Sequence, residues 1–458
     1  MEQRTPRLMV SALSSGSGKT TVTCGLLRAA LDRGLRPCAF KCGPDYIDPM
    51  FHRSVLGVPS RNLDLFFSRE EAVCQSLASA SFGHDLAVME GVMGCFDGVA
   101  GTTRASSWHL AVATATPMVL VVRPGGSSTT LAAMIQGVCR FRAENSIEGV
   151  ILNQCGEKLA SKLTPIIEQE TGVKVFGFLP KLEGCALPSR HLGLYTPGEI
   201  QDLSAILGRV ARQMEETVDL DGMFSLAASA PQLVWERKQE ISQPGPHAPV
   251  VAVARDEAFC FYYPDNLELL EQNGLSLREF SPLRDQRLPE GTCGVYLGGG
   301  YPELYTRQLS ENRSLLAQLR AMAEAGMPML GECGGFLYLQ QSLEDPEGNP
   351  WPMAGVLEGR GYKTGRLQRF GYVTLRAEED NPFLRRGEQF PAHEFHRWDC
   401  TENGAQCRAL RPDGETSWNC MTCKGNILAG FPHLYYPAIP QLPARFAQAC
   451  AQYQEEHP

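Results

Sequence analysis

The stretch SSGSGKTT, at residues 14–21, follows a short apolar run at residues 7–13 and opens a segment of helical periodicity. A predicted strand that runs through such a loop into a helix is the setting of a phosphate-binding loop, whose backbone N–H groups surround phosphate oxygens. Lys19 would reach the outer phosphates, and the Thr20 hydroxyl would hold Mg²⁺. A plain Gly/Ser-rich turn is the alternative, because Leu13 stands where the usual first glycine would be. The residues expected to bind the nucleotide are Gly16, Gly18, Lys19, Thr20 and Thr21.

The same alternation of apolar strands and helical segments continues through the first half of the chain. Further buried strands are predicted at residues 86–89, 118–122 and 150–152. Strands that alternate with helices pair in parallel, since each helix carries the chain back across the sheet. The pattern therefore predicts an α/β fold in which a mostly parallel sheet is flanked by helices.

A second domain is predicted beyond a stretch that is rich in proline. The chain has 458 residues, which exceeds one ordinary hydrophobic core. Residues 239–249 contain three prolines and a glycine, and a new apolar strand follows at residues 250–254. We therefore expect domains at residues 1–238 and 249–458, each with a mostly parallel sheet flanked by helices, joined by a linker at residues 239–248.

Composition narrows the class of protein. The formal net charge is −9, from 42 Lys plus Arg against 51 Asp plus Glu, which argues against binding nucleic acid. No signal peptide is recognisable, and no apolar stretch reaches the roughly 20 residues that span a bilayer. We therefore expect a cytoplasmic enzyme without membrane contact, in which most of the 16 cysteines are reduced thiols.

Two acidic motifs follow predicted strands in the first half. They read KCGPDYIDP at residues 41–49 and EGVMGCFDG at residues 90–98. Because ligands collect at the carboxyl ends of strands in open α/β sheets, Glu90 is expected to bind Mg²⁺ or to help a carboxylate meet the γ-phosphate. Helix caps and turns are the alternative for Glu90, Asp48 and Asp97.

The second half carries a candidate nucleophile. The motif GECGG at residues 331–335 lies between a strand-like run at residues 327–330 and an apolar segment at residues 336–339. A nucleophile flanked by small residues between strand and helix is typical of a nucleophile elbow, where the helix dipole favours the Cys333 thiolate. A buried structural cysteine is the alternative.

A cysteine nucleophile needs a base and an oxyanion hole. His433 ends a short apolar run, and His393 and His396 are its competitors; spacing alone does not choose among them. The glycine triplet at residues 298–300 follows another predicted strand, and its backbone N–H groups could stabilise a tetrahedral intermediate. A plain glycine turn remains the alternative for that triplet.

Together these motifs resemble the cobyrinic acid a,c-diamide synthase family. The family joins a dethiobiotin-synthetase-like ATP domain, of the P-loop NTPase type, to a triad-type glutamine amidotransferase domain. The resemblance covers nearly the whole chain and rests on residues 14–21, 41–49, 90–98, 187–194, 298–300, 331–335 and 393–396.

The resemblance also implies roles for individual residues. It implies His433 as the base for Cys333 and the N–H groups of Gly299 and Gly300 as the oxyanion hole. The implied Mg²⁺ residues are Thr20, Asp45 and Glu90, and the residues implied nearer the substrate carboxylate are Tyr46, Asp48 and Asp97. The wider amidotransferase group has a Glu two residues after the base, but Tyr435 stands there in this chain. A Cys–His dyad is therefore expected, and the group that orients His433 is left open.

The implied activity is that of a ligase that forms C–N bonds with glutamine as amido donor. ATP would phosphorylate a carboxylate of cobyrinic acid, Cys333 would release ammonia from L-glutamine, and ammonia would replace the phosphate at the a and c acetates, in cobalamin biosynthesis. The expected cofactors are ATP and Mg²⁺, and the expected partners are small molecules. A homodimer is the alternative to a single chain.

Other functions fit parts of the sequence. The motifs do not separate cobyrinic acid from hydrogenobyrinic acid or nickel-sirohydrochlorin as substrate. A non-catalytic ATPase switch of the partitioning type would use a related phosphate loop, but it has no reason to carry the elbow. A structural zinc site is the remaining alternative, at Cys400, Cys407, Cys420 and Cys423, although the first pair is spaced more widely than is usual for zinc.

Overall fold

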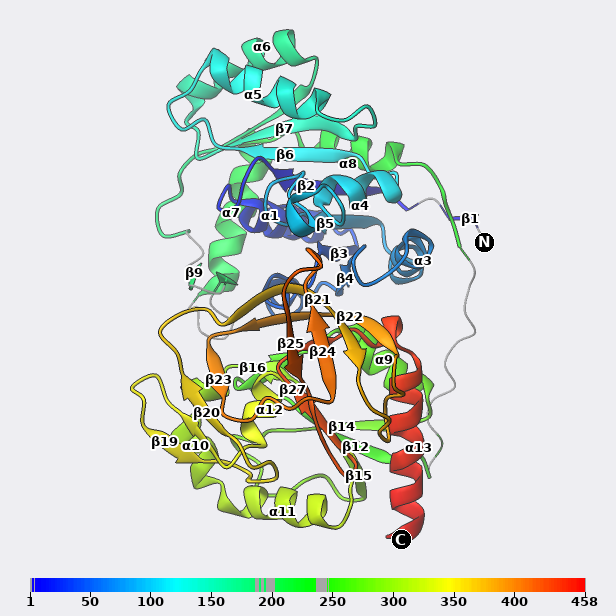
Figure 1. The fold of residues 1–458 in the computed structure, drawn as a ribbon. Coiled ribbons are helices and arrows are strands. Elements are labelled where there is room, and N and C mark those ends of the chain that lie inside the picture. Colours follow the sequence, from blue (N-terminus) through cyan, green and yellow to red (C-terminus); the bar gives the residue numbers. More distant parts are fainter. Residues whose placement is uncertain are drawn as a thin grey trace. The chain divides into compact units, whose positions relative to one another are not determined.

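The computed structural model describes residues 2–3, 5–185, 189–190, 193–194, 202–235, 245 and 247–457. It divides into two compact units, Met1–Lys238 and Gln239–Pro458 (Figure 1). Among the described residues, none of the helices combines the length and apolar character needed to traverse a lipid bilayer. Of the motif at residues 187–194, only two short paired strands are described, β9 (Ser189–Arg190) and β10 (Gly193–Leu194); the rest lies outside the described residues.

Unit 1 is built on a seven-stranded sheet in which every neighbouring pair is parallel. In spatial order the strands are β4 (Ser60–Leu63), β3 (Pro37–Cys42), β5 (Leu86–Glu90), β2 (Arg7–Ala12), β6 (Met118–Val122), β7 (Ile147–Asn153) and β8 (Lys174–Leu179). The strands β2, β3, β5 and β6 are buried along their full length, because helices cover such a sheet on both faces. The predicted parallel sheet of the first half is confirmed.

The helices of unit 1 follow the strands in alternation. They are α1 (Lys19–Asp32), α2 (Ile47–Met50), the π-helix η1 (Phe51–Val55), α3 (Glu70–Ala80), the 3-10 turn η2 (Val99–Gly101), α4 (Ser107–Ala113), α5 (Thr129–Arg140), α6 (Glu157–Thr171), α7 (Leu203–Thr217) and α8 (Leu220–Ser229). Helix α1 packs on β2, β3 and β5, and α7 packs along α1. The loop before α1 therefore opens at the carboxyl end of the central strand β2. A short pair, β1 (Glu2–Gln3) and β11 (Leu233–Val234), completes the unit.

Unit 2 contains a six-stranded sheet whose members are parallel except for one edge strand. Its order is β14 (Ser276–Phe280), β12 (Val250–Ala254), β15 (Thr292–Leu297), β17 (Met329–Glu332), β27 (Ile427–Gly430) and the antiparallel β26 (Thr422–Lys424). Its helices are α9 (Pro264–Gln272), η4 (Pro302–Leu304), α10 (Thr306–Glu311), α11 (Arg313–Glu324), α12 (Gly334–Tyr338), η5 (Tyr436–Ala438) and α13 (Gln441–Glu456). This mostly parallel sheet agrees with the predicted fold class.

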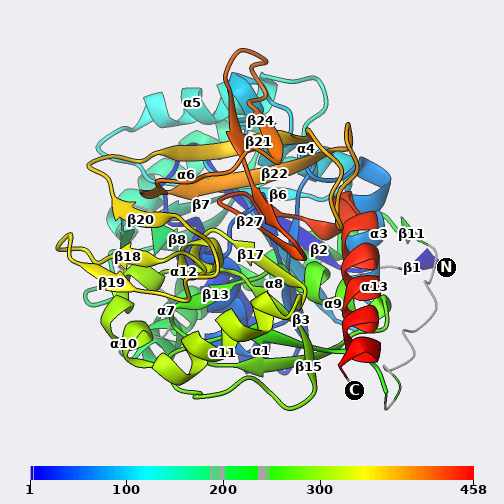
Figure 2. The ribbon, with the colours of Figure 1, turned by 60° about the horizontal axis from the view of Figure 1, so that its bottom comes forward.

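Unit 2 also has a second large sheet, which the sequence did not predict. This five-stranded antiparallel sheet runs β25 (Ser417–Cys420), β24 (Cys407–Leu410), β21 (Arg369–Ala377), β22 (Gln389–His396) and β28 (His433–Leu434), and its long strands β21 and β22 lie side by side in Figure 2. Smaller sheets join β19 (Pro350–Pro352), β18 (Ser342–Glu344), β20 (Arg360–Lys363) and β23 (Trp398–Cys400), and pair β13 (Phe259–Phe261) with β16 (Gly299–Gly300). All three candidate histidines lie on β22 or β28.

Candidate active sites

The phosphate loop connects β2 to α1 and is held open by its glycines. Gly16 and Gly18 have φ of 74° and 99°, in the left-handed region that favours glycine. A Cβ on Gly18 would lie 2.1 Å from Nδ2 of Asn153, whose amide donates to the Ser17 carbonyl oxygen at 2.7 Å. The end of β7 therefore holds the loop, and a side chain at position 18 would be strained at this φ and would displace the Asn153 amide.

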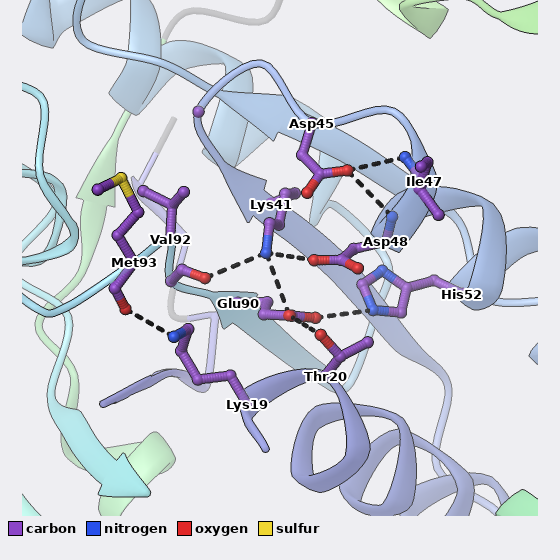
Figure 3. Close-up of polar contacts among 12 residues, drawn as sticks. Lys19, Thr20, Lys41, Asp45, Ile47, Asp48, His52, Glu90, Val92 and Met93 are labelled. Carbon is purple, nitrogen blue, oxygen red and sulfur yellow. Dashed lines mark hydrogen bonds and ion pairs between the residues drawn. The ribbon is translucent and has the colours of Figure 1, made fainter. Parts of the chain in front are cut away.

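The Lys19 side chain lies across the loop. Its Nζ donates to the carbonyl oxygen of Met93 at 2.6 Å (Figure 3). It also donates to the carbonyl oxygen of Ser14 at 3.2 Å. Burial, and next the positive charge of Lys41, lower the pKa of Lys19 to about 8. The ammonium group thus lies between the phosphate loop and the motif at residues 90–98. A bound anion there would stabilise its protonated form.

A buried charge cluster lies directly beside the loop (Figure 3). Lys41 of β3 and Glu90 of β5 are neighbours across two parallel strands, so their side chains meet on one face of the sheet. Glu90 Oε1 accepts a hydrogen bond from Thr20 Oγ1 at 2.6 Å and one from Lys41 Nζ at 3.1 Å. Lys41 Nζ also contacts the Asp48 carboxylate, and His52 Nε2 lies 3.5 Å from Glu90 Oε2. The predicted residues Thr20, Asp48 and Glu90 are therefore brought together.

Each charge in this cluster shifts the pKa values of its neighbours. Burial acts against the charge of Lys41, but the carboxylates of Asp48 and Glu90 prevail and hold the pKa of Lys41 above its ordinary value. Burial likewise acts against the charge of Glu90, yet Lys41 and His52 outweigh it and lower the pKa of that carboxyl. The pKa of Asp48 is raised by burial and then by the charges of Asp45 and Glu90. One lysine thus faces several carboxyls, and a further cation would stabilise the ionised form of Asp48.

Thr20 and Glu90 fit a magnesium ion that is shared with a nucleotide. Among the described residues, the buried Glu90 Oε2 accepts no hydrogen bond of normal geometry and lies 3.5 Å from His52 Nε2, and the Thr20 hydroxyl already points to the same carboxylate. Mg²⁺ is usually held by one or two carboxylates together with phosphates and water. No group of three or more His, Cys, Asp and Glu side chains placed for a metal occurs in the described part of the chain, so a metal cage made of protein ligands alone is not present there.

The other predicted residues of unit 1 have different surroundings. Asp45 Oδ1 accepts hydrogen bonds from the backbone N–H groups of Ile47 and Asp48, at 2.8 and 3.2 Å, so this oxygen fixes the turn into α2. Tyr46 is buried, whereas Asp97 is exposed and its Oδ2 accepts from the Gly94 N–H at 2.8 Å. Asp97 is therefore the one of these that lies at the surface.

Sequence reasoning missed two members of the cluster. Lys41 lies in the motif at residues 41–49 but has no predicted role, and His52 lies outside the predicted motifs. His52 is fully buried, and its Nδ1 lies 3.0 Å from Ser60 Oγ. The signal was present for Lys41, because the residues before it, at positions 37–40, form a buried strand, and a lysine at the end of such a strand needs an acidic partner.

Cys333 sits at a strained turn between β17 and α12. Its φ is 48° and its ψ is −100°, which is unusual for a residue with a side chain. The turn is tight enough to require its glycines: a Cβ on Gly335 would lie 2.1 Å from the Leu297 carbonyl oxygen, and one on Gly334 would lie 2.9 Å from Pro302 Cδ. This is the backbone geometry that the GECGG motif predicted for a nucleophile elbow.

His433 lies at the elbow. The Cys333 N–H donates to the Gly430 carbonyl oxygen at 2.8 Å, which joins the elbow to the segment that leads into His433. A Cβ on Gly299 would lie 2.4 Å from Cε1 of His433, so the imidazole packs directly on the glycine triplet. Glu332 Oε2 lies 3.9 Å from His433 Nδ1. The predicted base and the predicted oxyanion-hole segment are thus adjacent.

The competing histidines have other surroundings. Both ring nitrogens of His396 have polar neighbours, the Trp398 carbonyl oxygen at 2.7 Å and Glu394 Oε2 at 3.4 Å, and its ring stacks on Phe431 with centroids 3.7 Å apart. His393 is the direct cross-strand neighbour of His433, because β22 pairs with β28 in that register. Both nitrogens and one face of the His396 ring are therefore in contact with other groups, and His393 lies beside the candidate base.

The candidate nucleophile and the candidate base are both uncharged at rest. Burial, and next the Glu303 carboxylate, raise the pKa of the Cys333 thiol well above its ordinary value. Burial, and next the neighbouring His393, lower the pKa of His433 to about 3. At neutral pH the thiol is therefore protonated. The expected thiolate is wrong for the resting site, because burial outweighs the helix dipole. The imidazole is neutral, which is the form that can accept a proton.

Gly299 and Gly300 form β16, which pairs with β13. Gly300 has a φ of 158°, and a Cβ there would lie 2.1 Å from the Ala258 carbonyl oxygen. The backbone nitrogen of Gly300 lies 3.1 Å from the position that a Cβ on Gly334 would take, so this amide is at the start of α12. The segment is therefore close enough to the elbow to supply N–H donors.

The four cysteines of the zinc alternative are spread over four strands. Cys407 and Cys420 are direct neighbours across β24 and β25, whereas Cys400 lies in β23 and Cys423 in β26. They are all free thiols. No metal-binding group of three or more such side chains was found where the structure is described, which argues against this alternative.

Each half of the chain matches a known protein family. Residues 8–194 match the CobQ/CobB/MinD/ParA nucleotide binding domain, and residues 250–438 match the CobB/CobQ-like glutamine amidotransferase domain. A protein named cobyrinate a,c-diamide synthase from Caldanaerobacter subterraneus subsp. tengcongensis is 38% identical over 97% of this chain and 98% of its own length. Proteins of the same name from Clostridium acetobutylicum and Listeria innocua are each 39% identical over 94% of this chain and 97% of their own length. The chain therefore belongs to the cobyrinate a,c-diamide synthase family.

Proposed function

We propose that this chain is an ATP- and glutamine-dependent ligase that converts the a and c acetate carboxylates of cobyrinic acid into amides, in cobalamin biosynthesis. The observation that carries the proposal is the presence of both half-sites, the phosphate loop with its buried carboxylates and the strained cysteine elbow, in one chain that matches its relatives over nearly its whole length. A partitioning-type switch has no use for the elbow.

In unit 1 the proposed reaction activates a carboxylate. A carboxylate oxygen of the corrinoid attacks the γ-phosphorus of ATP, the bond to the β,γ-bridging oxygen breaks, and ADP leaves. Lys19 and the N–H groups of the loop neutralise charge on the phosphates, and Thr20 and Glu90 would hold Mg²⁺, which would supply charge neutralisation at the β- and γ-oxygens. The acyl phosphate then reacts with ammonia, and inorganic phosphate is released as the amide forms.

The acidic motifs are proposed to bring the corrinoid carboxylate to the γ-phosphate. Glu90 is buried beside the phosphate loop. Asp97 is exposed, and it lies in the motif at residues 90–98, whose Cys95 N–H donates to the Ala12 carbonyl oxygen at 2.8 Å. Asp48 and Tyr46 lie under the same end of the sheet. We assign Asp45 to the metal side and Asp97, Asp48 and Tyr46 to the substrate side.

In unit 2 the proposed reaction releases ammonia from glutamine. His433 takes the Cys333 proton, the thiolate attacks the carboxamide carbon, and the N–H groups of Gly299 and Gly300 stabilise the oxyanion. The imidazolium gives its proton to the leaving ammonia, and water then hydrolyses the thioester to glutamate. Burial keeps the thiol protonated at rest, so the base is required for this attack.

A reciprocal pair of variants tests the proposal. Lys19→Ala should abolish ATP-dependent amidation and spare glutamine hydrolysis, because it alters only the phosphate loop. Cys333→Ala and His433→Ala should lose glutamine hydrolysis and still make amide from ammonium at raised pH, whereas His396→Ala should retain glutamine hydrolysis.

The assay is amide formation, followed by mass spectrometry, with cobyrinic acid, hydrogenobyrinic acid and nickel-sirohydrochlorin in parallel. Glutamine and ammonium are each supplied as nitrogen source. Amidation of cobyrinic acid at the highest rate is the expected result. ATP hydrolysis with no amidated product from any of the three acids would reject the proposed function, and a preference for another acid would correct the substrate.

A further inference from the structure

Glu332 is a buried carboxyl that none of the steps above uses. It is the last residue of β17 and directly precedes Cys333, and its exposed fraction is 2%. Burying an ionised carboxyl costs stability, because the charge loses its hydration. Burial raises the pKa of Glu332 to about 8. Carboxyls with such perturbed pKa values in an active site are candidates for a functional role.

The surroundings of Glu332 hold its two oxygens in different directions. Oε1 accepts hydrogen bonds from the hydroxyls of Tyr296 and Tyr436, each at 3.2 Å. Oε2 accepts from the Leu434 N–H at 3.4 Å and lies 3.9 Å from His433 Nδ1. Three donors thus fix the carboxyl, and its second oxygen is directed to the imidazole of the proposed base.

The usual source of an orienting acid is absent from this chain. The residue two positions after His433 is Tyr435, whose ring packs edge-on against Tyr263 with centroids 5.5 Å apart. A phenol in an aromatic contact cannot replace a carboxylate beside an imidazolium. The carboxyl that lies near His433 Nδ1 comes instead from the strand that carries the nucleophile.

We propose that Glu332 is the positioning residue of the glutaminase site: its Oε2 holds the ring of His433 through Nδ1 and stabilises the imidazolium that forms when Cys333 gives up its proton. This inference rests on the proposed function. The proton moves from Cys333 Sγ to the imidazole. The new positive charge lowers the raised pKa of the neighbouring Glu332 carboxyl, so its ionised form is favoured there and stabilises the imidazolium without bonding to substrate. Glu332 Oε2 and His433 Nδ1 are 3.9 Å apart, and a movement of about 1 Å would bring them within hydrogen-bond distance. Catalytic hydrogen bonds often shorten in this way only when substrate is bound.

Glu332→Gln tests this role with little change in shape. The amide keeps an oxygen that can accept from the tyrosine hydroxyls, but it cannot carry the negative charge. We expect kcat for glutamine hydrolysis to fall roughly 10- to 100-fold, less than the ~10⁴-fold known for a triad acid in direct contact, because the resting separation is long. KM for glutamine should stay within about twofold, since Glu332 does not touch substrate. Amide synthesis from ammonium should be unchanged.

Asp345→Asn is the matched control. Asp345 is another buried carboxyl of unit 2, but it fixes a turn by accepting from Trp351 Nε1 at 3.0 Å and from the Asn349 N–H at 2.8 Å. Its loss should leave kcat for glutamine hydrolysis within about twofold of the wild type. If Glu332→Gln unfolds unit 2, as judged by hydrogen exchange in β15 and β17, Glu332→Asp replaces it. That variant withdraws the oxygens by one methylene and should show the same fall in kcat.

The outcomes separate this inference from the function on which it rests. A wild-type protein without glutaminase activity, or a Cys333→Ala variant that retains it, would overturn the proposed function. A wild-type protein with Cys333-dependent glutaminase activity, in which the folded Glu332 variant keeps kcat within about twofold, would overturn the role of Glu332 alone. An equal loss of kcat in Asp345→Asn, or a loss in Glu332→Gln that appears only as a raised KM, would also overturn it.

Discussion

Replacing Lys41 by methionine tests the charge cluster of unit 1. Methionine keeps much of the apolar stem of the buried lysine but removes the ammonium group from Glu90 Oε1, from the Asp48 carboxylate and from the Gly91 carbonyl oxygen. Breaking a buried ion pair by removing one partner costs about 3–5 kcal/mol, because the other charge is left uncompensated. We expect unit 1 to lose stability by that amount at pH 8.

The loss should depend on pH with a definite sign. In the wild type the folded-state pKa of Glu90 lies below its ordinary value of 4.5, so its contribution to stability is present above that pH and is lost as pH falls through the folded pKa. Without Lys41, burial dominates and the carboxyl pKa rises above the ordinary value, so the ionised form increasingly opposes folding as pH rises. At pH 5 the deficit should be smaller by about 1–2 kcal/mol, since one pKa unit corresponds to 1.36 kcal/mol.

The assay is urea unfolding at pH 5 and pH 8, with hydrogen-exchange mass spectrometry of peptides from β3 and β5 to assign the transition to unit 1. Lys158→Met, at an exposed position of α6, is the control and should stay within about 0.5 kcal/mol of the wild type at both pH values. A Lys41→Met variant within about 1 kcal/mol of the wild type at pH 8, or one whose deficit grows as pH falls, would contradict a stabilising role of the Lys41 ammonium group.

Two further predictions concern the elbow and the phosphate loop. Gly335→Ala places a Cβ 2.1 Å from the Leu297 carbonyl oxygen, so it should cost unit 2 at least about 2 kcal/mol and abolish glutamine hydrolysis while synthesis from ammonium persists. Gly365→Ala, with open space around it, is the control, and wild-type glutaminase activity in Gly335→Ala would contradict the tight turn. Since the pKa of Lys19 is lowered to about 8, KM for ATP should be constant below that pH and rise above it as the ammonium loses its proton. A KM that is flat through pH 9.5, measured by initial rates, would show that Lys19 does not carry the phosphate contact.

Local patterns predicted much of the fold. The strands at residues 118–122 and 250–254 agree with β6 and β12 at both ends, because buried parallel strands are continuous apolar runs bounded by polar turns. The five-stranded antiparallel sheet was not predicted. It joins segments separated by up to tens of residues, and its pairing depends on long-range register, which no local pattern contains.

The candidate sites were predictable to the same extent. Lys19 and Cys333 lie in motifs whose glycines indicate a tight turn, so these two residues could be predicted from local sequence. Local sequence could not choose among the three histidines, because their positions depend on the pairing of β28 with β22. The contact of Lys41 with Glu90 likewise arises from the register of β3 with β5. The place of Glu332 beside His433 follows from tertiary packing alone.

The backbone of Cys333 has a consequence for how the sequence can change over time. At a φ of 48° a cysteine stores strain of about 1–3 kcal/mol that glycine would not incur. Selection for folding alone therefore favours the loss of the nucleophile, and only selection for ammonia release maintains it. In a lineage supplied with ample free ammonium, the amidotransferase unit would become catalytically inert before it became unstable, and it would persist as a folded companion of an active synthetase.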